Sequence, residues 1–181
     1  MSASKTRGKI LMVLWAAERP LTLEGIAEKI GLISSSTMGY LLGLIKAKYV
    51  SVPEKHQYKI TSLGKKAIGM PILNKDLAIN ILKSVSLDNA FQFYFALDQY
   101  TGVHANSLKD FVDKIQTVDL KSIEFHAPRK DFELWINSLG DVELAKRLEI
   151  IRMKKLTGKN LRTQIHQAVS SRLEELTKLS M

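Results

Sequence analysis

Three serines and a threonine, Ser34 to Thr37, stand directly before the apolar run MGYLLGLI in this chain of 181 residues. A Ser or Thr hydroxyl at the start of a helix accepts a hydrogen bond from the free N–H groups of the first turn. Small side chains of this kind also leave a helix N-terminus open to phosphate, which the helix dipole attracts. Either property predicts a helix that begins here, and the neighbouring sequence has to decide whether the serines only cap it or also face a phosphate group.

A second set of polar residues in the other half of the chain could do different chemistry. It consists of His104, His126, Arg129, Asp131 and Glu133. A His beside an Asp can act as a general base with an orienting carboxylate, or can bind a metal. The chain has neither an H-E-x-x-H spacing nor a glycine-rich phosphate loop. We favour a structural interpretation, in which Asp131 caps or pairs near the start of a helix while His126 and Arg129 line a turn held by Pro128; no catalytic residue, cofactor or metal is predicted.

The absence of cysteine removes several classes of function. The chain can form no disulfide and has no thiolate nucleophile or cysteine-ligated zinc or iron–sulfur site. The residues after Met1 do not form a secretory signal, and no apolar run approaches the roughly 20 residues that a membrane-spanning helix needs. We expect a soluble, cytoplasmic protein with no membrane partner.

The net charge of +9 is concentrated in the first part of the chain. Residues 1–75 contain 12 Lys and Arg against 4 Glu, a net charge of +8, whereas residues 76–181 contain 15 against 14, a net charge of +1. A basic segment beside a nearly neutral one is typical of a protein whose first half meets a polyanion. A solubilising surface is the alternative explanation.

Apolar periodicity in the first 75 residues predicts three short helices, a hairpin and a fourth helix. The first two helices should end at Arg19-Pro20 and at Gly31, and the third should bury Leu41, Leu44 and Ile45. The alternating runs YVSV and QYKIT, separated by PEKH, predict a hairpin with a polar, basic tip. The expected ranges are 5–18, 22–30 and 34–48 for the helices, 50–60 for the hairpin, and a fourth helix from Thr61 or Ser62 to the break at Gly69-Met70-Pro71.

The run GLISSSTMGYLLGLIKAKYVSV, followed by YKITSLGKKAI, resembles the recognition helix, wing and closing helix of winged-helix regulators of the MarR, PadR and ArsR kinds. The resemblance covers roughly residues 5 to 70. It implies that the helix over 34–48 enters the DNA major groove while the wing over 50–60 lies along the backbone. The implied DNA-contacting residues are Ser34, Ser35, Ser36, Thr37, Tyr40 and Lys46 on that helix, Lys55, His56 and Lys59 on the wing, and Lys5, Arg7 and Lys9 on the first helix.

The third helix offers few side chains for reading bases. Specific contacts usually come from Arg, Lys, Asn or Gln on the exposed face. This helix instead offers Tyr40, Lys46 and Lys48 beside Gly39 and Gly43. We expect DNA binding with limited direct readout. The alternative is a winged-helix adaptor that binds protein and not DNA, and its mark would be an exposed apolar face at Met38 and Leu42.

The second half predicts a mostly helical α+β domain with one hairpin. FQFYFAL is a strand by its period, DQYTG supplies a turn and VHA a returning strand. Asn106 or Ser107 should cap the helix SLKDFVDKI, and Gly140-Asp141 should end one later helix and cap another. The expected division is a winged helix-turn-helix domain over 1–71, a linker helix within 72–90 and an α+β domain over 91–181. Six aromatic residues, either core or the wall of a ligand pocket, are Phe91, Phe93, Phe95, Phe125, Phe132 and Trp135.

Residues 91 to about 175 resemble an archaeal domain family of unknown function, through the runs YTGVHANSLKDF, KSIEFHAPRKDFELWI and LGDVELAKRL. The resemblance implies an archaeal, cytosolic setting and a separately evolved module. The last helix, 158–179, carries an apolar stripe that could pair with its copy in a homodimer or pack on its own domain. The sequence thus predicts a transcriptional regulator that binds double-stranded DNA as a homodimer, with a small-molecule or protein effector at the second domain. The adaptor is the second choice and an enzyme built on His104, His126 and Asp131 is the third.

Overall fold

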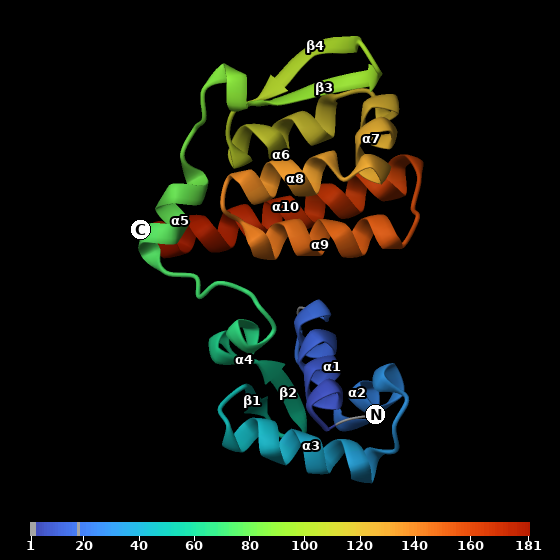
Figure 1. Ribbon diagram of the computed structural model, residues 1–181, viewed down its shortest axis with the longest axis vertical. Coiled ribbons are helices and arrows are strands. Elements are labelled where there is room, and N and C mark those ends of the chain that lie inside the picture. Colours follow the sequence, from blue (N-terminus) through green and yellow to red (C-terminus); the bar gives the residue numbers. More distant parts are fainter. Residues whose placement is uncertain (1–2, 18) are drawn as a thin grey trace. The chain divides into compact units, whose positions relative to one another are not determined.

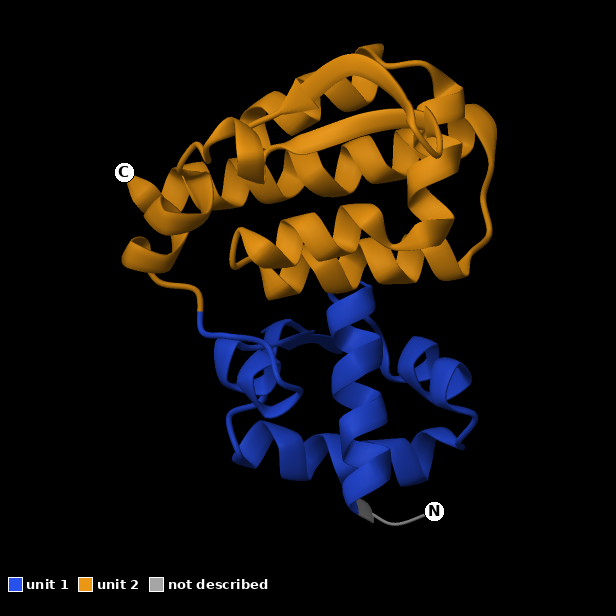
Figure 2. Cartoon of the chain, turned by 45° about the horizontal axis from the view of Figure 1, so that its top comes forward, with its two compact units in different colours: residues 1–72 blue, residues 73–181 orange. Residues whose placement is uncertain are grey.

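The chain divides into two compact units, residues 1–72 and 73–181, in the computed structural model, which describes residues 3–17 and 19–181 (Figures 1 and 2). Both units are mostly helical and each contains one two-stranded antiparallel hairpin. The chain ends in a long helix, so the predicted α+β, mostly helical class is confirmed. Within the described residues, no helix is long and apolar enough to cross a membrane.

The first unit contains four helices and one hairpin among its described residues. They are α1 (Ala3–Ala16), α2 (Leu23–Ile30), α3 (Ser34–Lys46), β1 (Val50–Glu54), β2 (Gln57–Ile60) and α4 (Ser62–Ala67). The core that these elements share includes Ile10, Leu14, Ile26 and Leu41. The predicted first helix extended to Glu18, which lies outside the described residues. The third helix ends at Lys46, two residues earlier than predicted, and Lys48 adopts a left-handed backbone (φ 61°).

Two of the predicted helix starts in this unit have side-chain caps. The Thr22 hydroxyl accepts a hydrogen bond from the Gly25 N–H (3.2 Å), and the Thr61 hydroxyl accepts one from the Gly64 N–H (3.1 Å). Helix α2 ends at Gly31, whose left-handed backbone (φ 72°) is favourable for glycine. These three boundaries are confirmed.

The predicted serine cap of α3 is wrong. The N-cap position is Ile33, which has an extended backbone and offers no side-chain acceptor. Because Ser34, Ser35 and Ser36 already have helical backbone, they form the first turn of the helix and cannot cap it. The Thr37 hydroxyl donates a hydrogen bond back to the Ile33 carbonyl (3.0 Å) and lies in the core.

The β1–β2 hairpin is attached to the segment between α1 and α2. Leu21 and Tyr58 form an antiparallel bridge in which each N–H donates to the other's carbonyl, at 3.0 and 2.8 Å. The hairpin pairing is irregular between Ser51 and Glu54, where Pro53 has no N–H to donate. The chain turns at Lys55 and His56, and His56 adopts a left-handed backbone (φ 62°). The predicted hairpin with a polar, basic tip is confirmed.

The second unit packs helices against one face of its hairpin (Figure 1). Its elements are α5 (Lys75–Leu82), β3 (Phe91–Ala96), β4 (Gln99–Ala105), α6 (Leu108–Thr117), α7 (Leu120–His126), α8 (Asp131–Ser138), α9 (Val142–Met153) and α10 (Gly158–Ser180). Short 3₁₀ turns lie between α5 and β3, at 87–89, and between α7 and α8, at 127–129. Ser107 caps α6 and Asp141 caps α9, as predicted.

The segment 72–90 contains one α-helix, α5, which packs on α10 and lies in the second compact unit. One expectation for this unit needs correction. The predicted turn DQYTG is mostly strand, because the chain reverses earlier, at Leu97 and Asp98, where Asp98 takes the left-handed backbone (φ 60°) that a tight turn requires.

The aromatic residues of the second unit mainly form its core. Phe91, Phe93, Phe132 and Trp135 are buried, and Phe91 packs on the other three. By contrast, Phe95 is 40% exposed. The remaining member, Phe125, lies under the guanidinium of Arg129, 4.8 Å from the ring centre. The set is therefore core for the most part.

Helix α10 packs on its own unit. Its buried stripe is Leu161, Ile165, Val169, Arg172 and Leu176. The helix contacts α5, α6, α7 and α9, which cover this stripe. Of the two alternatives for the last helix, packing on its own domain is the one observed, so the stripe is not the surface through which two copies could pair.

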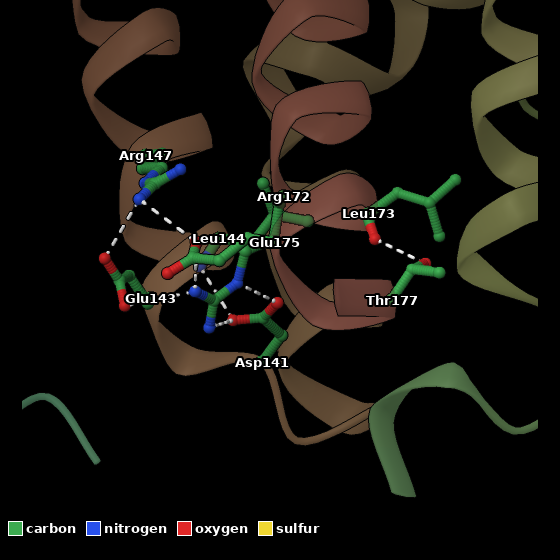
Figure 3. A network of polar contacts seen from close by, with 8 residues as sticks. All are labelled: Asp141, Glu143, Leu144, Arg147, Arg172, Leu173, Glu175 and Thr177. Carbon is green, nitrogen blue, oxygen red and sulfur yellow. Dashed lines mark hydrogen bonds and ion pairs between the residues drawn. The ribbon is translucent and has the colours of Figure 1, made fainter. Parts of the chain in front are cut away.

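A buried ionic network joins α9 to α10 (Figure 3). The Arg172 guanidinium donates to both carboxylate oxygens of Asp141 (2.8 and 2.9 Å), to Glu143 (3.3 Å) and to Glu175 (2.8 Å). Arg172, Asp141 and Glu143 are each at most 2% exposed. Burial by itself lowers the pKa of Arg172, but the hydrogen bonds and negative charges of its partners outweigh burial and raise that pKa. The arginine therefore stays charged, and Asp141 serves both as its partner and as the cap of α9.

We predict that Arg172→Ala lowers the free energy of unfolding of the second unit by about 3–5 kcal/mol, because it removes the guanidinium that binds both carboxylate oxygens of the buried Asp141 and one of the two arginines that pair with Glu143. Urea unfolding followed by Trp135 fluorescence, in a Trp15→Phe background, measures this loss. Lys146→Ala is the control: it breaks an exposed ion pair with Glu149, and such pairs contribute about 0–1 kcal/mol. Equal effects of the two substitutions would contradict the assigned role of Arg172.

Candidate nucleic-acid interface

One side of α3 faces the core and the opposite side faces solvent. Thr37, Leu41 and Leu44, spaced by four and three residues, are buried, and α3 packs on α1 and α2. The residues on the opposite side are Ser35, Gly39, Leu42 and Lys46, and all four are exposed. We call these four residues the outward stripe. At about 1.5 Å of rise per residue, the stripe is about 16 Å long.

The sequence-predicted contacts on α3 occupy different environments. Ser35, Ser36 and Lys46 are exposed, whereas Ser34 and Tyr40 are half-buried at the flanks of the stripe. Thr37 is fully buried and its hydroxyl is engaged with the Ile33 carbonyl. Its side chain is thus part of the core, and we leave it out of the candidate interface.

Arg7 brings a positive charge from α1 to the side of α3. The side chain is exposed, and its Nη2 atom lies 3.6 Å from the place that a Cβ would occupy at Gly43. Lys5 and Lys9, on the same helix, are exposed as well. The Arg7 guanidinium therefore lies against Gly43, next to the outward stripe.

The hairpin presents a further group of cations. Lys55 and His56 form its tip and Lys59 lies on β2, and all three side chains are exposed. Lys59 stands opposite Ser51 in the pairing. The one acidic residue of the hairpin is Glu54, next to the tip. The hairpin is therefore positively charged where it extends from the unit.

The charge imbalance follows the division into units. Residues 1–72 contain 11 Lys and Arg against 4 Glu, a net charge of +7, and residues 73–181 contain 16 against 14, a net charge of +2. No Asp or Glu occurs in the sequence of α3, β2 or α4. A polyanion would meet little repulsion at α3.

Exposed apolar side chains near α3 were only partly foreseen. Leu42 is 59% exposed and Ile33 is 69% exposed, whereas Met38 is half-buried. Leu42 is one of the two residues whose exposure would indicate an adaptor. The exposure of Ile33 was not predicted from the sequence. Its signal was present in the sequence, as an apolar residue directly before the serines.

The histidine and aspartate candidates of the second unit form a structural contact. His126 Nε2 accepts a hydrogen bond from the Tyr94 N–H (2.8 Å), so the ring proton lies on Nδ1 and is donated to Asp131 (2.7 Å). Arg129 Nε donates to the same Asp131 oxygen (3.2 Å). Both nitrogens of His126 are thus engaged in holding α7 to β3 and to the start of α8. The geometry agrees with the structural interpretation of these residues.

The other two candidates have other neighbours. His104 stands on β4 opposite Gln92, and Glu133 accepts a hydrogen bond from Arg152 Nε (2.7 Å). In the part of the chain that the structure describes, no three His, Asp or Glu side chains are placed to share a metal ion.

A surface depression of about 270 Å³ lies beside the start of α10. Its lining includes the apolar residues Ala127, Pro128, Leu156 and Leu161, with Arg152, Lys155, Glu124 and Thr157 as polar members. Glu124 accepts a hydrogen bond from the Gly158 N–H (2.8 Å) and so occupies the N-terminus of the helix.

Comparison with known proteins adds no function. No protein-family model, curated protein or solved structure matches this chain. The function is therefore argued from the geometry and charge described above.

We predict that acid destabilises the second unit through His126. Burial lowers the pKa of His126 below its ordinary value of 6.5, although Asp131 opposes that shift. Since the folded state binds the proton more weakly than the unfolded state, this contribution to stability is complete above about pH 6.5 and is lost as the pH falls below it.

Urea unfolding at about pH 7.5 and about pH 5.5 measures the effect. His126→Gln keeps an acceptor for the Tyr94 N–H but cannot titrate, so it should be less stable than the wild type at the higher pH and should lose less stability between the two values. An equal loss in both proteins would show that His126 does not carry the pH dependence.

Proposed function

We propose that this protein is a transcriptional regulator that binds double-stranded DNA through a winged helix-turn-helix in its first unit. In this proposal α2 and α3 are the helix-turn-helix, α3 enters the major groove, and the β1–β2 hairpin is the wing. The order of helices around a hairpin, together with the Leu21–Tyr58 bridge, supports this assignment. The proposal rests above all on α3, whose exposed side has no acidic residue and is accompanied by exposed cations.

The geometry suggests how each part would contact DNA. The major groove is about 12 Å wide and admits one helix. The first turn of α3 has no side-chain cap, so its backbone N–H groups and the exposed hydroxyls of Ser35 and Ser36 can donate to a phosphate. Arg7, Lys55 and Lys59 would add phosphate contacts, which give affinity but no sequence information.

We propose that the second unit serves dimerisation and sensing, in an archaeal, cytoplasmic protein. A homodimer would place two copies of α3 on paired half-sites. Since the apolar stripe of α10 is covered within its own unit, the dimer would use another surface. A small-molecule effector would find space in the depression lined by Arg152, Lys155 and Leu156, and a protein effector is the alternative partner.

A protein–protein adaptor without DNA binding is the second candidate function. The exposure of Leu42 and Ile33 favours it, because apolar side chains in contact with water are common at protein interfaces. An adaptor would not require the cations around α3. The salt dependence of DNA binding separates the two functions.

We predict that the purified full chain binds a random-sequence duplex and that the logarithm of its affinity falls linearly with the logarithm of the salt concentration. Removal of two phosphate contacts by the double substitution Lys55→Ala, Lys59→Ala should reduce the slope by roughly two units. Fluorescence anisotropy of the labelled duplex at rising salt measures the slope. Titration of the duplex with protein, at concentrations well above the dissociation constant, measures how many chains bind each duplex.

The double substitution Lys109→Ala, Lys121→Ala is the matched control. It also removes two exposed lysines, but from α6 and α7 of the second unit, so it should leave the slope unchanged. Absence of binding at low salt would argue for the adaptor. An equal loss of slope in both double variants would show that the hairpin is not a specific DNA element.

A further inference from the structure

We infer that α3 recognises the 5-methyl group of thymine through Leu42, so that the preferred DNA has A·T pairs beneath the middle of the helix. This inference rests on the proposed DNA-binding function and adds the chemistry by which bases are distinguished. It assigns Leu42 as a specificity-determining residue.

The composition of α3 leaves an apolar contact as its main means of reading bases. Hydrogen-bonded readout in the major groove depends largely on Arg, Lys, Asn and Gln. Among residues 34–46 there is no Arg, Asn or Gln, and the single Lys is the last residue of the helix. The outward stripe begins with Ser35 and Gly39 and ends with Lys46, so Leu42 is the one large side chain at its middle.

The neighbours of Leu42 permit close approach to the groove. Gly39 lies one turn earlier on the outward stripe, and a Cβ there would meet nothing within 4 Å. Gly43, the next residue along, has only the Arg7 guanidinium near it. Because neither glycine has a side chain, the Leu42 isobutyl group extends further from the helix than its neighbours at positions 39 and 43. Glycine is suited to such a place because it allows a ligand to approach the backbone.

Thymine is the one base that matches such a group. Its 5-methyl is the apolar feature that the base pairs display in the major groove, where the remaining groups are hydrogen-bond donors and acceptors. Removing a methyl-sized apolar surface from water contributes about 0.8 kcal/mol, which is about fourfold in affinity. The leucine would therefore favour thymine over bases that lack the methyl.

Charge and spacing favour DNA over a protein as the occupant of this surface. Leu42 lies between cations, with Arg7 on one side and Lys46 one turn further along α3. The exposed Ile33 is nine residues earlier, about 13 Å along the helix axis, so the two do not form one apolar patch. The other large apolar residues of α3, namely Met38, Leu41, Leu44 and Ile45, are half-buried or buried. The cations beside Leu42 would attract the DNA phosphates, and the single exposed leucine would contact one thymine methyl group.

The experiment compares two duplexes that differ only in the methyl group. One is an A·T-rich duplex and the other has deoxyuridine at every thymidine position, which keeps the phosphates and the hydrogen-bonding edges. The full chain should bind the thymine duplex about fourfold more tightly for each methyl contacted. Leu42→Ala should bind both duplexes alike, with an affinity near that of the wild type for the uracil duplex. Leu97→Ala, which truncates a leucine 70% exposed in the second unit, should keep the wild-type ratio.

Each other result overturns a defined part of the account. Salt-dependent binding of wild type to both duplexes with equal affinity would refute methyl recognition and leave the DNA-binding function standing. A thymine preference that persists in Leu42→Ala would remove Leu42 as the reader. Failure to bind either duplex at low salt would refute the DNA-binding function itself, and α3 would then be a surface for a protein.

Discussion

The burial of Thr37, Leu41 and Leu44 in the first unit determines which residues of α3 face solvent. With 3.6 residues per turn, a helix held by these three positions must turn Ser35, Gly39, Leu42 and Lys46 outward. The hydroxyl of Thr37 reinforces this orientation, because it bonds to the Ile33 carbonyl and can be buried without loss. The Leu21–Tyr58 bridge ties the hairpin to the same framework. The proposed reading surface is thus a consequence of core packing on the other side of one helix.

The two units use their charged residues differently. In the second unit many charges are paired within the fold, as in the Arg172 network (Figure 3) and in the contact among His126, Arg129 and Asp131. The Arg172 network holds α9 to α10, where the groups are buried and an uncompensated charge would be costly. The His126–Asp131 contact holds α7 to the start of α8. In the first unit the excess is positive, and most of the lysines near α3 and the hairpin are exposed. Such a surface contributes little to stability and can instead attract a polyanion.

Local signals in the sequence were sufficient for most helices and both hairpins. The caps at Thr22, Thr61, Ser107 and Asp141 were visible because a short polar side chain stands directly before an apolar period. The N-cap of α3 could not be identified in this way, because four consecutive hydroxyl residues offer several positions for a cap. Tertiary packing places the N-cap at Ile33 instead. The Arg172 network could not be predicted from periodicity, because its partners come from separate helices. Within the candidate interface, the exposed lysines were foreseen, whereas the burial of Thr37 and the position of Arg7 beside Gly43 depend on how α1 crosses α3.

Hydrogen–deuterium exchange of the full chain, with and without a random-sequence duplex at low salt, tests the central claim most directly. It reports, segment by segment, which backbone amides a bound ligand protects. The account predicts added protection at the start of α3 and in the β1–β2 hairpin, with exchange in α8, α9 and α10 unchanged. Protection confined to the second unit, or none in the presence of bound duplex, would contradict the assignment of the first unit as the DNA-binding element.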